Sequence, residues 1–352
     1  MTSRTAMLPL KAVSRLVRKR TTSNCTTLDQ QTTPGSYGSA ILATCGLVSV
    51  VVSSEKEHSR NDAMVSSTPN LHRYFDEDYD LVNARTLGQG AFGMVMQCVH
   101  KEHKTVSAVK VVADGYNEAE REKNALSCVE HAGGHPNIVQ LDNFYTHDGF
   151  HYMVLEYVQG STLFDYVAQR KQLSQEDATT ILTQVASALE FMHAHGMVHC
   201  DLKPDNVMIA DDMKVKIIDF GSATIPNPTV SGLPLKRALT LSTAPLSGTK
   251  TYWSPEMLAG KSPIQVGPSM DMWSLGCLLY IMLSGRHPFD ARGNLSEEMI
   301  LHNIVHAPVV FSGPVWASVS PEMKALVQQM LEKDPEARLT AAQLVAKLNS
   351  LM

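Results

Sequence analysis

Long apolar runs and paired cysteines are both missing from this 352-residue chain. The longest apolar run, residues 41–52, is shorter than the roughly 18 residues that a membrane-spanning helix needs, so the sequence predicts no transmembrane segment. The six cysteines are scattered and form no CxxC pair, which indicates reduced thiols rather than a disulfide framework. Basic residues are not in excess either. With a net charge of −5, no general attraction to nucleic acid or to anionic membranes is expected.

The first 76 residues differ in composition from the rest of the chain. Residues 1–20 contain six basic side chains, and no acidic residue precedes Asp29. Three interpretations stay open for this segment: a solvated tail without fixed structure, a mitochondrial targeting segment whose apolar residues form one helical stripe, or a mispredicted start, since Met64 precedes the folded region. We therefore predict that residues 1–76 are an extension of the folded domain at 77–352. We expect a cytoplasmic location, with a mitochondrial one as the alternative.

Strand and helix patterns divide the rest of the chain into two regions. At 79–112, Val, Thr and Leu alternate with polar residues and are broken by glycines, and 151–158 is a further strand pattern. One helical pattern, 117–132, lies between them, and helical patterns dominate afterwards. The sequence thus predicts an α+β protein with a small β-rich lobe at about 77–158 and a larger helical lobe at about 159–352. A ligand would bind between such lobes.

A glycine pattern opens the β-rich region. In "GQGAFGMV", Gly88, Gly90 and Gly93 follow the spacing GxGxxG, which lets backbone amides approach phosphate oxygens without a Cβ clash. Alone, this spacing fits an ordinary hairpin equally well. The strand that follows ends in "SAVK" at Lys110, which is either an outward surface lysine or a buried cation that needs a carboxylate partner.

Three glutamates of the helical pattern at 117–132 compete as that partner: Glu118, Glu120 and Glu122. Glu122 is preferred because Leu126, one turn later, gives it an inward-facing neighbour. The pair would compensate the ammonium group of the lysine while it binds a phosphate.

The segment "MVHCDLKPDNVMI", residues 197–209, places several polar residues in a mostly apolar stretch. Asp201 can accept a proton from an attacking hydroxyl, Lys203 can neutralise charge on a group in transfer, and Asn206 offers an oxygen to a cation. Thirteen residues after Asn206, an apolar strand ends at Asp219, a suitable Mg²⁺ ligand. Each acid alone is typical of a turn or cap, but the ordered set indicates phosphate and metal chemistry.

These motifs resemble those of eukaryotic-type serine/threonine protein kinases from about residue 80 to the C-terminus. The similar segments are "GQGAFGMV", "AVK", "HCDLKPDNV", "DFG", "SPE" at 254–256, "DMWSLG" at 271–276 and "DPEARLT" at 334–340. Segments nearer the C-terminus, such as "HPFDARGNLSEEMILHNI", are most similar to the calcium/calmodulin-dependent kinase group. The resemblance implies a bilobal kinase fold and transfer of the γ-phosphoryl group of ATP to protein serine or threonine hydroxyls with Mg²⁺.

The resemblance also implies roles for individual residues. The implied catalytic residues are Lys110, Glu122, Asp201, Lys203 and Thr249. The implied metal ligands are Asn206 and Asp219. Besides the three glycines and the lysine, the implied nucleotide-binding residues are Leu87, Val95, Ala108, Glu156, Val158 and Met208. Of these, the apolar residues Leu87, Val95, Ala108 and Met208 would form the walls of the adenine site, and the backbone of Glu156 and Val158 would bond the adenine edge. In this family the lysine binds the α- and β-phosphates and pairs with the glutamate, and the aspartate of the "DLKPDN" segment is the catalytic base.

Further positions resemble structural contacts of the family. Glu256 and Arg338 correspond to a buried ion pair of the larger lobe, and Asp271 to an acid that anchors the backbone of the catalytic loop. Thr249 stands where serine/threonine kinases place a threonine that bonds the aspartate and lysine of that loop.

Cys200 departs from the family pattern, which has an arginine before the catalytic aspartate. That arginine pairs with a phosphorylated residue of the activation loop, and a thiol carries no charge for this contact. We therefore expect activity to depend little on phosphorylation of the 38-residue loop from Asp219 to Glu256. The thiol is interpreted as a small buried packing residue, with a redox role as the alternative.

Two other functions stay open at this point. A pseudokinase would keep the fold as a binding or scaffolding module, but the chain retains Lys110, Asp201 and Asp219. A kinase for small molecules is the other, and the segment "GTKTYWSPE" argues against it. The expected partners are protein substrates. Direct control by calmodulin is not expected, because the chain ends at Met352, just after the last helical pattern and without the calmodulin-binding tail of that group.

Overall fold

The structure is a computed structural model that describes residues 74–89, 93–225, 249–259 and 266–351. The predicted extension at 1–76 lies almost entirely outside the described residues, as do Gly90 and residues 226–248 of the loop. Within the described ranges, no helix combines the length and the apolar composition needed to cross a lipid bilayer.

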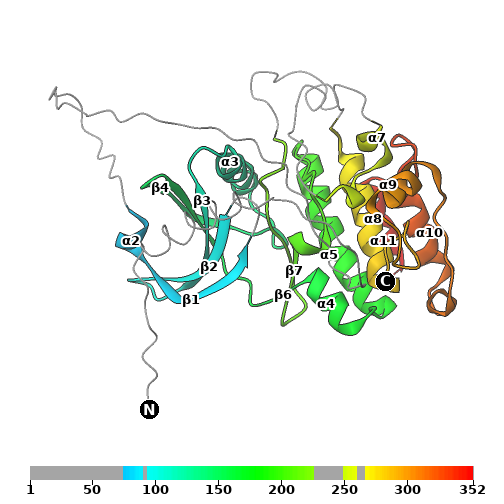
Figure 1. The fold of residues 1–352 in the computed structure, drawn as a ribbon, viewed down its shortest axis with the longest axis horizontal. Coiled ribbons are helices and arrows are strands. Elements are labelled where there is room, and N and C mark those ends of the chain that lie inside the picture. The colour runs from blue at the N-terminus through cyan, green and yellow to red at the C-terminus, as the bar shows by residue number, and fades with distance from the viewer. Residues whose placement is uncertain (1–73, 90–92, 226–248, 260–265, 352) are drawn as a thin grey trace, which may run out of the picture. The chain divides into compact units, whose positions relative to one another are not determined.

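Five antiparallel strands form the sheet of the smaller lobe, in the spatial order β1-β2-β3-β5-β4. Figure 1 labels β1 to β4 of this sheet. Their bounds are β1 Tyr79–Gln89, β2 Gly93–His100, β3 Val106–Ala113, β4 Leu141–His147 and β5 Phe150–Glu156. A single helical turn, α2 (Phe75–Asp78), precedes them. Alternate residues of β2 are buried, namely Met94, Met96 and Cys98, as the period of a half-buried strand requires.

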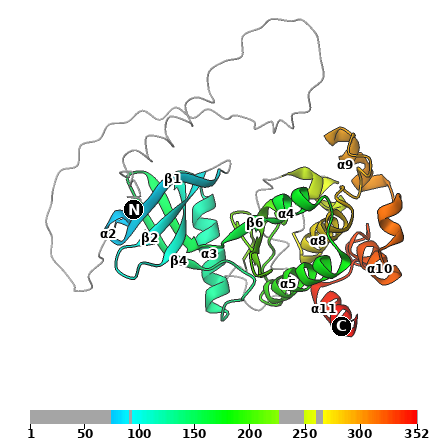
Figure 2. The same cartoon turned by 90° about the horizontal axis from the view of Figure 1, so that it is seen from below.

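Helix α3 (Glu118–His131) lies beside this sheet (Figure 2). Ala119 of the helix forms a buried cluster with Val112 of β3 and Met153 of β5. Strand register places Lys110 opposite Met153 and also opposite Val95. Because residues opposite each other in a sheet share a face, the lysine side chain projects on the face that α3 covers.

The larger lobe is mostly helical. Its helices are α4 Leu163–Arg170, α5 Gln175–Ala194, α7 Pro255–Leu258, α8 Pro268–Ser284, α9 Glu297–His306, α10 Pro321–Met330 and α11 Ala341–Leu351. Short 3₁₀ turns are η1 Pro204–Asn206, η3 Lys250–Tyr252 and η4 Pro314–Ala317. Helices α5, α9 and α10 each begin after a serine, Ser174, Ser296 and Ser320, whose side chain accepts a backbone N–H of the first turn.

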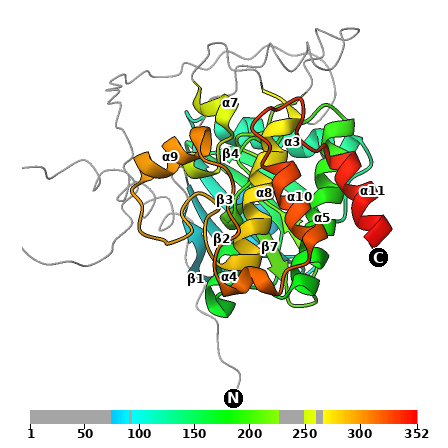
Figure 3. The same cartoon turned by 90° about the vertical axis from the view of Figure 1, so that its right-hand side faces the viewer.

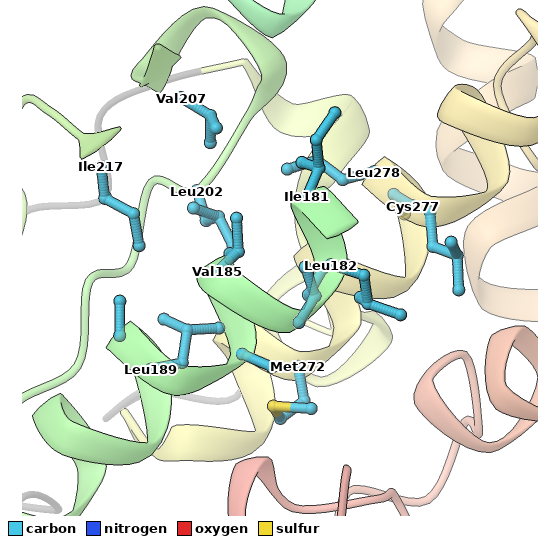
Figure 4. Close-up of a cluster of buried hydrophobic side chains, with 14 of the residues drawn as sticks. Ile181, Leu182, Val185, Leu189, Leu202, Val207, Ile217, Met272, Cys277 and Leu278 are labelled. Atoms are coloured by element: carbon cyan, nitrogen blue, oxygen red, sulfur yellow. The ribbon is translucent and has the colours of Figure 1, made fainter. Parts of the chain in front are cut away.

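Helix α8 is the centre of this lobe and packs against both α5 and α10 (Figure 3). Every residue from 270 to 280 is buried, as expected of a helix that is apolar on nearly all sides. Figure 4 shows Leu202 and Ile217 beside Val185 of α5, with Met272 of α8 in the same cluster. The core of the larger lobe thus extends directly beneath the segment that carries Asp201.

A second, three-stranded antiparallel sheet has the order β6-β7-β8, with bounds β6 Gly160–Thr162, β7 Val207–Ala210 and β8 Val215–Ile217. Met208 of β7 is paired with Lys216 of β8. Ile217 also forms a parallel bridge with Ile138, which precedes β4 of the smaller lobe. Strand β8 therefore contacts both lobes just before Asp219. The predicted α+β architecture, a β-rich lobe with one main helix and a larger helical lobe, is confirmed.

Candidate active site

Lys110 of β3 lies between two carboxylates from distant parts of the chain. Its Nζ is 2.6 Å from Glu122 Oε2 of α3 and 3.0 Å from Asp219 Oδ1. Burial acts to lower the pKa of the lysine, but the two carboxylates outweigh it and raise that pKa. The ammonium group is therefore charged where β3, α3 and the end of β8 meet. The prediction that Glu122, rather than Glu118 or Glu120, pairs with this lysine is confirmed.

The segment after β8 packs against the first turns of α3. The backbone N–H of Phe220 donates to Glu122 Oε1 at 3.2 Å. Buried Glu118 faces Gly221, where a Cβ would lie 2.6 Å from the glutamate Cγ, so a larger residue here would have to displace the glutamate side chain. Burial raises the pKa of Glu118 to about 7, and the nearby lysine only partly offsets this. The position of α3 and the backbone after β8 are thus coupled.

Asp219 combines an unusual backbone with a stabilised negative charge. Its φ of 66° lies in the left-handed region, which residues other than glycine adopt rarely and mostly at functional sites. Burial acts to raise the pKa of its carboxyl group, but Lys110 outweighs this and lowers it below the ordinary value. The side chain is therefore an anion at neutral pH.

The catalytic-loop residues form a compact polar group. Asp201 Oδ2 is 2.7 Å from Lys203 Nζ, and it accepts a second hydrogen bond from Asn206 Nδ2 at 3.1 Å. Burial raises the pKa of Asp201, and the ammonium group of the lysine offsets only part of this rise. The backbone N–H of Ile218 donates to Asn206 O at 2.9 Å, which places Asp219 next to this group.

Asp271 accepts hydrogen bonds from the backbone of the catalytic loop, as predicted. Its two carboxylate oxygens accept the backbone N–H groups of His199 and Cys200, each at 2.9 Å. His193 Nε2 lies 2.9 Å from Oδ2 of the same carboxylate, a contact that the sequence analysis did not anticipate. Asp271 is buried, yet these partners, His193 first, lower its pKa. The loop backbone is therefore fixed by an anion in the lobe core.

Cys200 is buried, with its φ of 66° in the left-handed region. It belongs to an apolar cluster with Val198, Met257, Val266 and Met270. Burial raises the pKa of its thiol well above the ordinary value, and the nearby Asp271 carboxylate adds to this. The thiol therefore stays protonated, which favours the packing interpretation over a redox role.

Most of the predicted nucleotide-binding residues lie on the strands of the smaller lobe or just after β5. Val95 is opposite Lys110, and Ala108, two residues earlier, shares its face. Leu87 is exposed. The side chains of four others are half-buried, namely Val95, Glu156, Val158 and Met208. Gly88 pairs with Val95, and a Cβ at Gly93 would lie 2.3 Å from the Val111 carbonyl oxygen. Packing on β3 is therefore one reason for that glycine.

Thr249 is not brought together with Asp201 and Lys203. Its side chain is exposed, and its carbonyl oxygen accepts the N–H of Tyr252 at the start of η3. The predicted hydrogen bonds from Thr249 to these two residues are not formed among the residues that the structure describes. Its catalytic role stays a prediction.

The predicted ion pair of the larger lobe is present. Arg338 NH1 and NH2 lie 2.6 Å and 2.9 Å from the two oxygens of Glu256, and the arginine side chain is fully buried. This bidentate pair joins α7 to the loop before α11 and stabilises the segment that follows the activation loop.

Comparisons with known proteins agree with this geometry. The protein kinase domain family matches residues 81–348. The serine/threonine-protein kinase PKZ1 of Phytophthora infestans is 37% identical over 276 residues, which cover 74% of this chain and 67% of that protein.

Two further relatives are longer proteins. The calcium/calmodulin-dependent protein kinase type II of Caenorhabditis elegans is 32% identical over 78% of this chain, and human ribosomal protein S6 kinase alpha-4 is 35% identical over 79%. The matched regions span only 36% and 35% of these two proteins. The chain belongs to the serine/threonine protein kinase family and is similar to its calcium/calmodulin-dependent group.

Proposed function

We propose that this chain transfers the γ-phosphoryl group of ATP to serine and threonine hydroxyls of proteins, with Mg²⁺ as the metal. The observation that carries the proposal is the position of Lys110, 2.6 Å from Glu122 and 3.0 Å from Asp219. This contact sets a fixed cation and a candidate metal ligand side by side. Phosphoryl transfer depends mostly on positioning and charge neutralisation, which such an arrangement supplies.

The oxygen ligands present fit Mg²⁺. Asn206 Nδ2 donates to the carbonyl oxygen of Asp201 at 2.8 Å, so the side-chain oxygen is the atom that can face a cation. Asp219 adds a carboxylate, and the described residues contain no group of three or more His, Cys, Asp or Glu that could hold a metal alone. Mg²⁺ prefers one or two protein oxygens plus nucleotide phosphates. When bound, the ion neutralises charge on the phosphoryl group.

Asp201 is the proposed base. Its carboxylate, held by Lys203 and Asn206, would orient the substrate hydroxyl and accept its proton. Lys203 would then neutralise charge on the transferred group, and Lys110 would hold the nucleotide phosphates.

The direct test is incubation of the purified chain with Mg²⁺, γ-labelled ATP and a mixed protein substrate. We expect label on serine and threonine and not on tyrosine. Binding of ATP without transfer of label would show instead a binding module that keeps the kinase fold.

The acid limb of the pH–rate profile should report Asp201. Because burial raises its pKa, kcat should fall on acidification at a pH above the ordinary aspartate value of about 3.9. The carboxylate is the active form, so activity is present above the raised pKa and is lost below it. The Lys203→Met variant removes the cation that lowers this pKa, and its acid limb should therefore lie at higher pH. Both profiles are measured with saturating ATP and Mg²⁺.

Protonation of the nucleotide affects the wild type and Lys203→Met equally. Only the difference in pH between their acid limbs therefore identifies Asp201 as the titrating group. Equal acid limbs for the wild type and Lys203→Met would assign the limb to another group and contradict the role of Asp201.

The packing of Cys200 supports a second part of the proposal, that loop phosphorylation is not needed for activity. Its thiol carries no charge and packs in an apolar cluster, so this position offers no cation to a phosphate. A variant with alanine at the serines and threonines of residues 226–248 in this loop, namely positions 229, 231, 240, 242, 243 and 247, should keep kcat within about threefold of the wild type. Steady-state kinetics of both proteins measures this ratio. Loss of turnover in this variant would contradict the proposal.

A further inference from the structure

An ion pair joins the two lobes at the end of β5. Lys216 Nζ of β8 lies 2.8 Å from Glu156 Oε2, and the two side chains are only 13% and 31% exposed. The same ammonium group lies 3.4 Å from the carbonyl oxygen of Ile138. The backbone N–H of Gln140 donates to the same carboxylate oxygen, Glu156 Oε2, at 3.4 Å. The pair therefore connects β5, the segment before β4 and β8.

The backbone of β8 is held at the same place. Val139 N–H donates to Ile217 O at 3.0 Å, and Ile217 N–H donates to Asn137 O at 2.8 Å. The side-chain amide of Asn137 donates to Val215 O at 2.9 Å. Through these hydrogen bonds, the position of β8 depends on the position of the segment before β4 in the smaller lobe. It leads directly to Asp219.

The pair also lies at the end of the proposed site that would hold the base of the nucleotide. Lys216 is opposite Met208, a proposed neighbour of the adenine ring. Glu156 and Val158 are the residues whose backbone would bond the adenine edge. The side chain of Glu156 is bonded to Lys216 of β8, and Asp219 follows β8 directly. The position of β8 therefore affects both the proposed adenine-binding backbone and the proposed metal ligand.

We propose that Lys216 is a positioning residue for nucleotide binding, an inference that rests on the proposed function. It holds the Glu156 backbone in the orientation that binds the adenine edge. A partly buried ion pair is screened less by solvent than a surface pair, so its loss removes a side-chain contact that connects the end of β5 to β8. The step of phosphoryl transfer should change less, because Asp271 holds the catalytic loop independently.

The Lys216→Met variant keeps the aliphatic stem but removes the charge. We expect KM for ATP, and the Kd for a non-hydrolysable ATP analogue measured by calorimetry, to rise about tenfold, with kcat within about twofold. Glu156→Gln should give the same pattern. Lys216→Arg keeps a cation within reach of the carboxylate and should restore most of the affinity.

Lys214→Met is the matched control, since Lys214 lies two residues earlier, is 76% exposed and pairs with the exposed Asp212. It should leave KM and Kd unchanged. A lowered melting temperature of Lys216→Met with unchanged Kd would show a purely structural role and overturn the inference. Calorimetry does not depend on turnover. A wild type that binds the analogue but transfers no label would contradict the proposed function alone.

Discussion

Replacement of Asp219 by alanine should reduce transfer of label from ATP by about a thousandfold or more. The carboxylate is the proposed metal ligand, and Glu122 cannot replace it without losing its bonds to Lys110 and to the Phe220 N–H. Stability should respond much less. The lysine keeps its shorter contact to Glu122, at 2.6 Å, so no uncompensated cation is left behind.

Asp212→Ala is the control for this experiment, because Asp212 is an exposed aspartate in the turn between β7 and β8 and pairs with Lys214 at the surface. It should keep the activity of the wild type. Transfer by Asp219→Ala at more than about a tenth of the wild-type rate would contradict the assignment of the metal ligand. Melting curves of both variants show whether the loss of activity reflects the site rather than unfolding.

Replacement of Glu256 by alanine should lower the free energy of unfolding more than any other single substitution proposed for this chain. Arg338 is fully buried, and Glu256→Ala leaves its guanidinium group without an anion, although it keeps hydrogen bonds to the carbonyl oxygens of Ser269 and Glu332. Breaking a buried ion pair from one side costs about 3–5 kcal/mol. Urea denaturation should therefore show a reduced free energy of unfolding with an unchanged m-value.

The double variant Glu256→Ala/Arg338→Met tests the physical cause. If the stranded charge is responsible, the double variant should be more stable than Glu256→Ala, because both charges are gone. A double variant that is no more stable than the single one would assign the loss to packing. Neither residue touches the proposed phosphate site, so any effect on activity should follow stability.

Local patterns predicted the elements and several contacts correctly. The helical neighbour Leu126, one turn later, predicts Glu122 rather than Glu118 or Glu120 as the partner of Lys110, and the structure forms that ion pair. Such predictions succeed because residues one turn apart on a helix share a face, so a buried Leu126 indicates which glutamate of α3 faces inward. Thr249 is different. Its partners lie in another segment, and its exposed position at the start of η3 depends on how the chain is placed after the loop.

Cys200 illustrates what composition leaves open. A thiol at this position is compatible with packing or with redox chemistry, and sequence alone offers no measure of its surroundings. Its cluster with Met257, Val266 and Met270 brings together segments up to 70 residues apart. Burial among these neighbours raises the pKa of the thiol, which favours packing over redox chemistry.

The sequence by itself determined the family, the two-lobed architecture and the order of the phosphate- and metal-binding candidates, because these are properties of short motifs and of local periodicity. Only the tertiary structure decided which groups meet. Lys110 and Asp219 are 109 positions apart, and Lys216 and Glu156 are 60 apart. Such contacts depend on how the two lobes dock through β8. Their geometry is set by the packing of whole elements, and no local pattern carries that information.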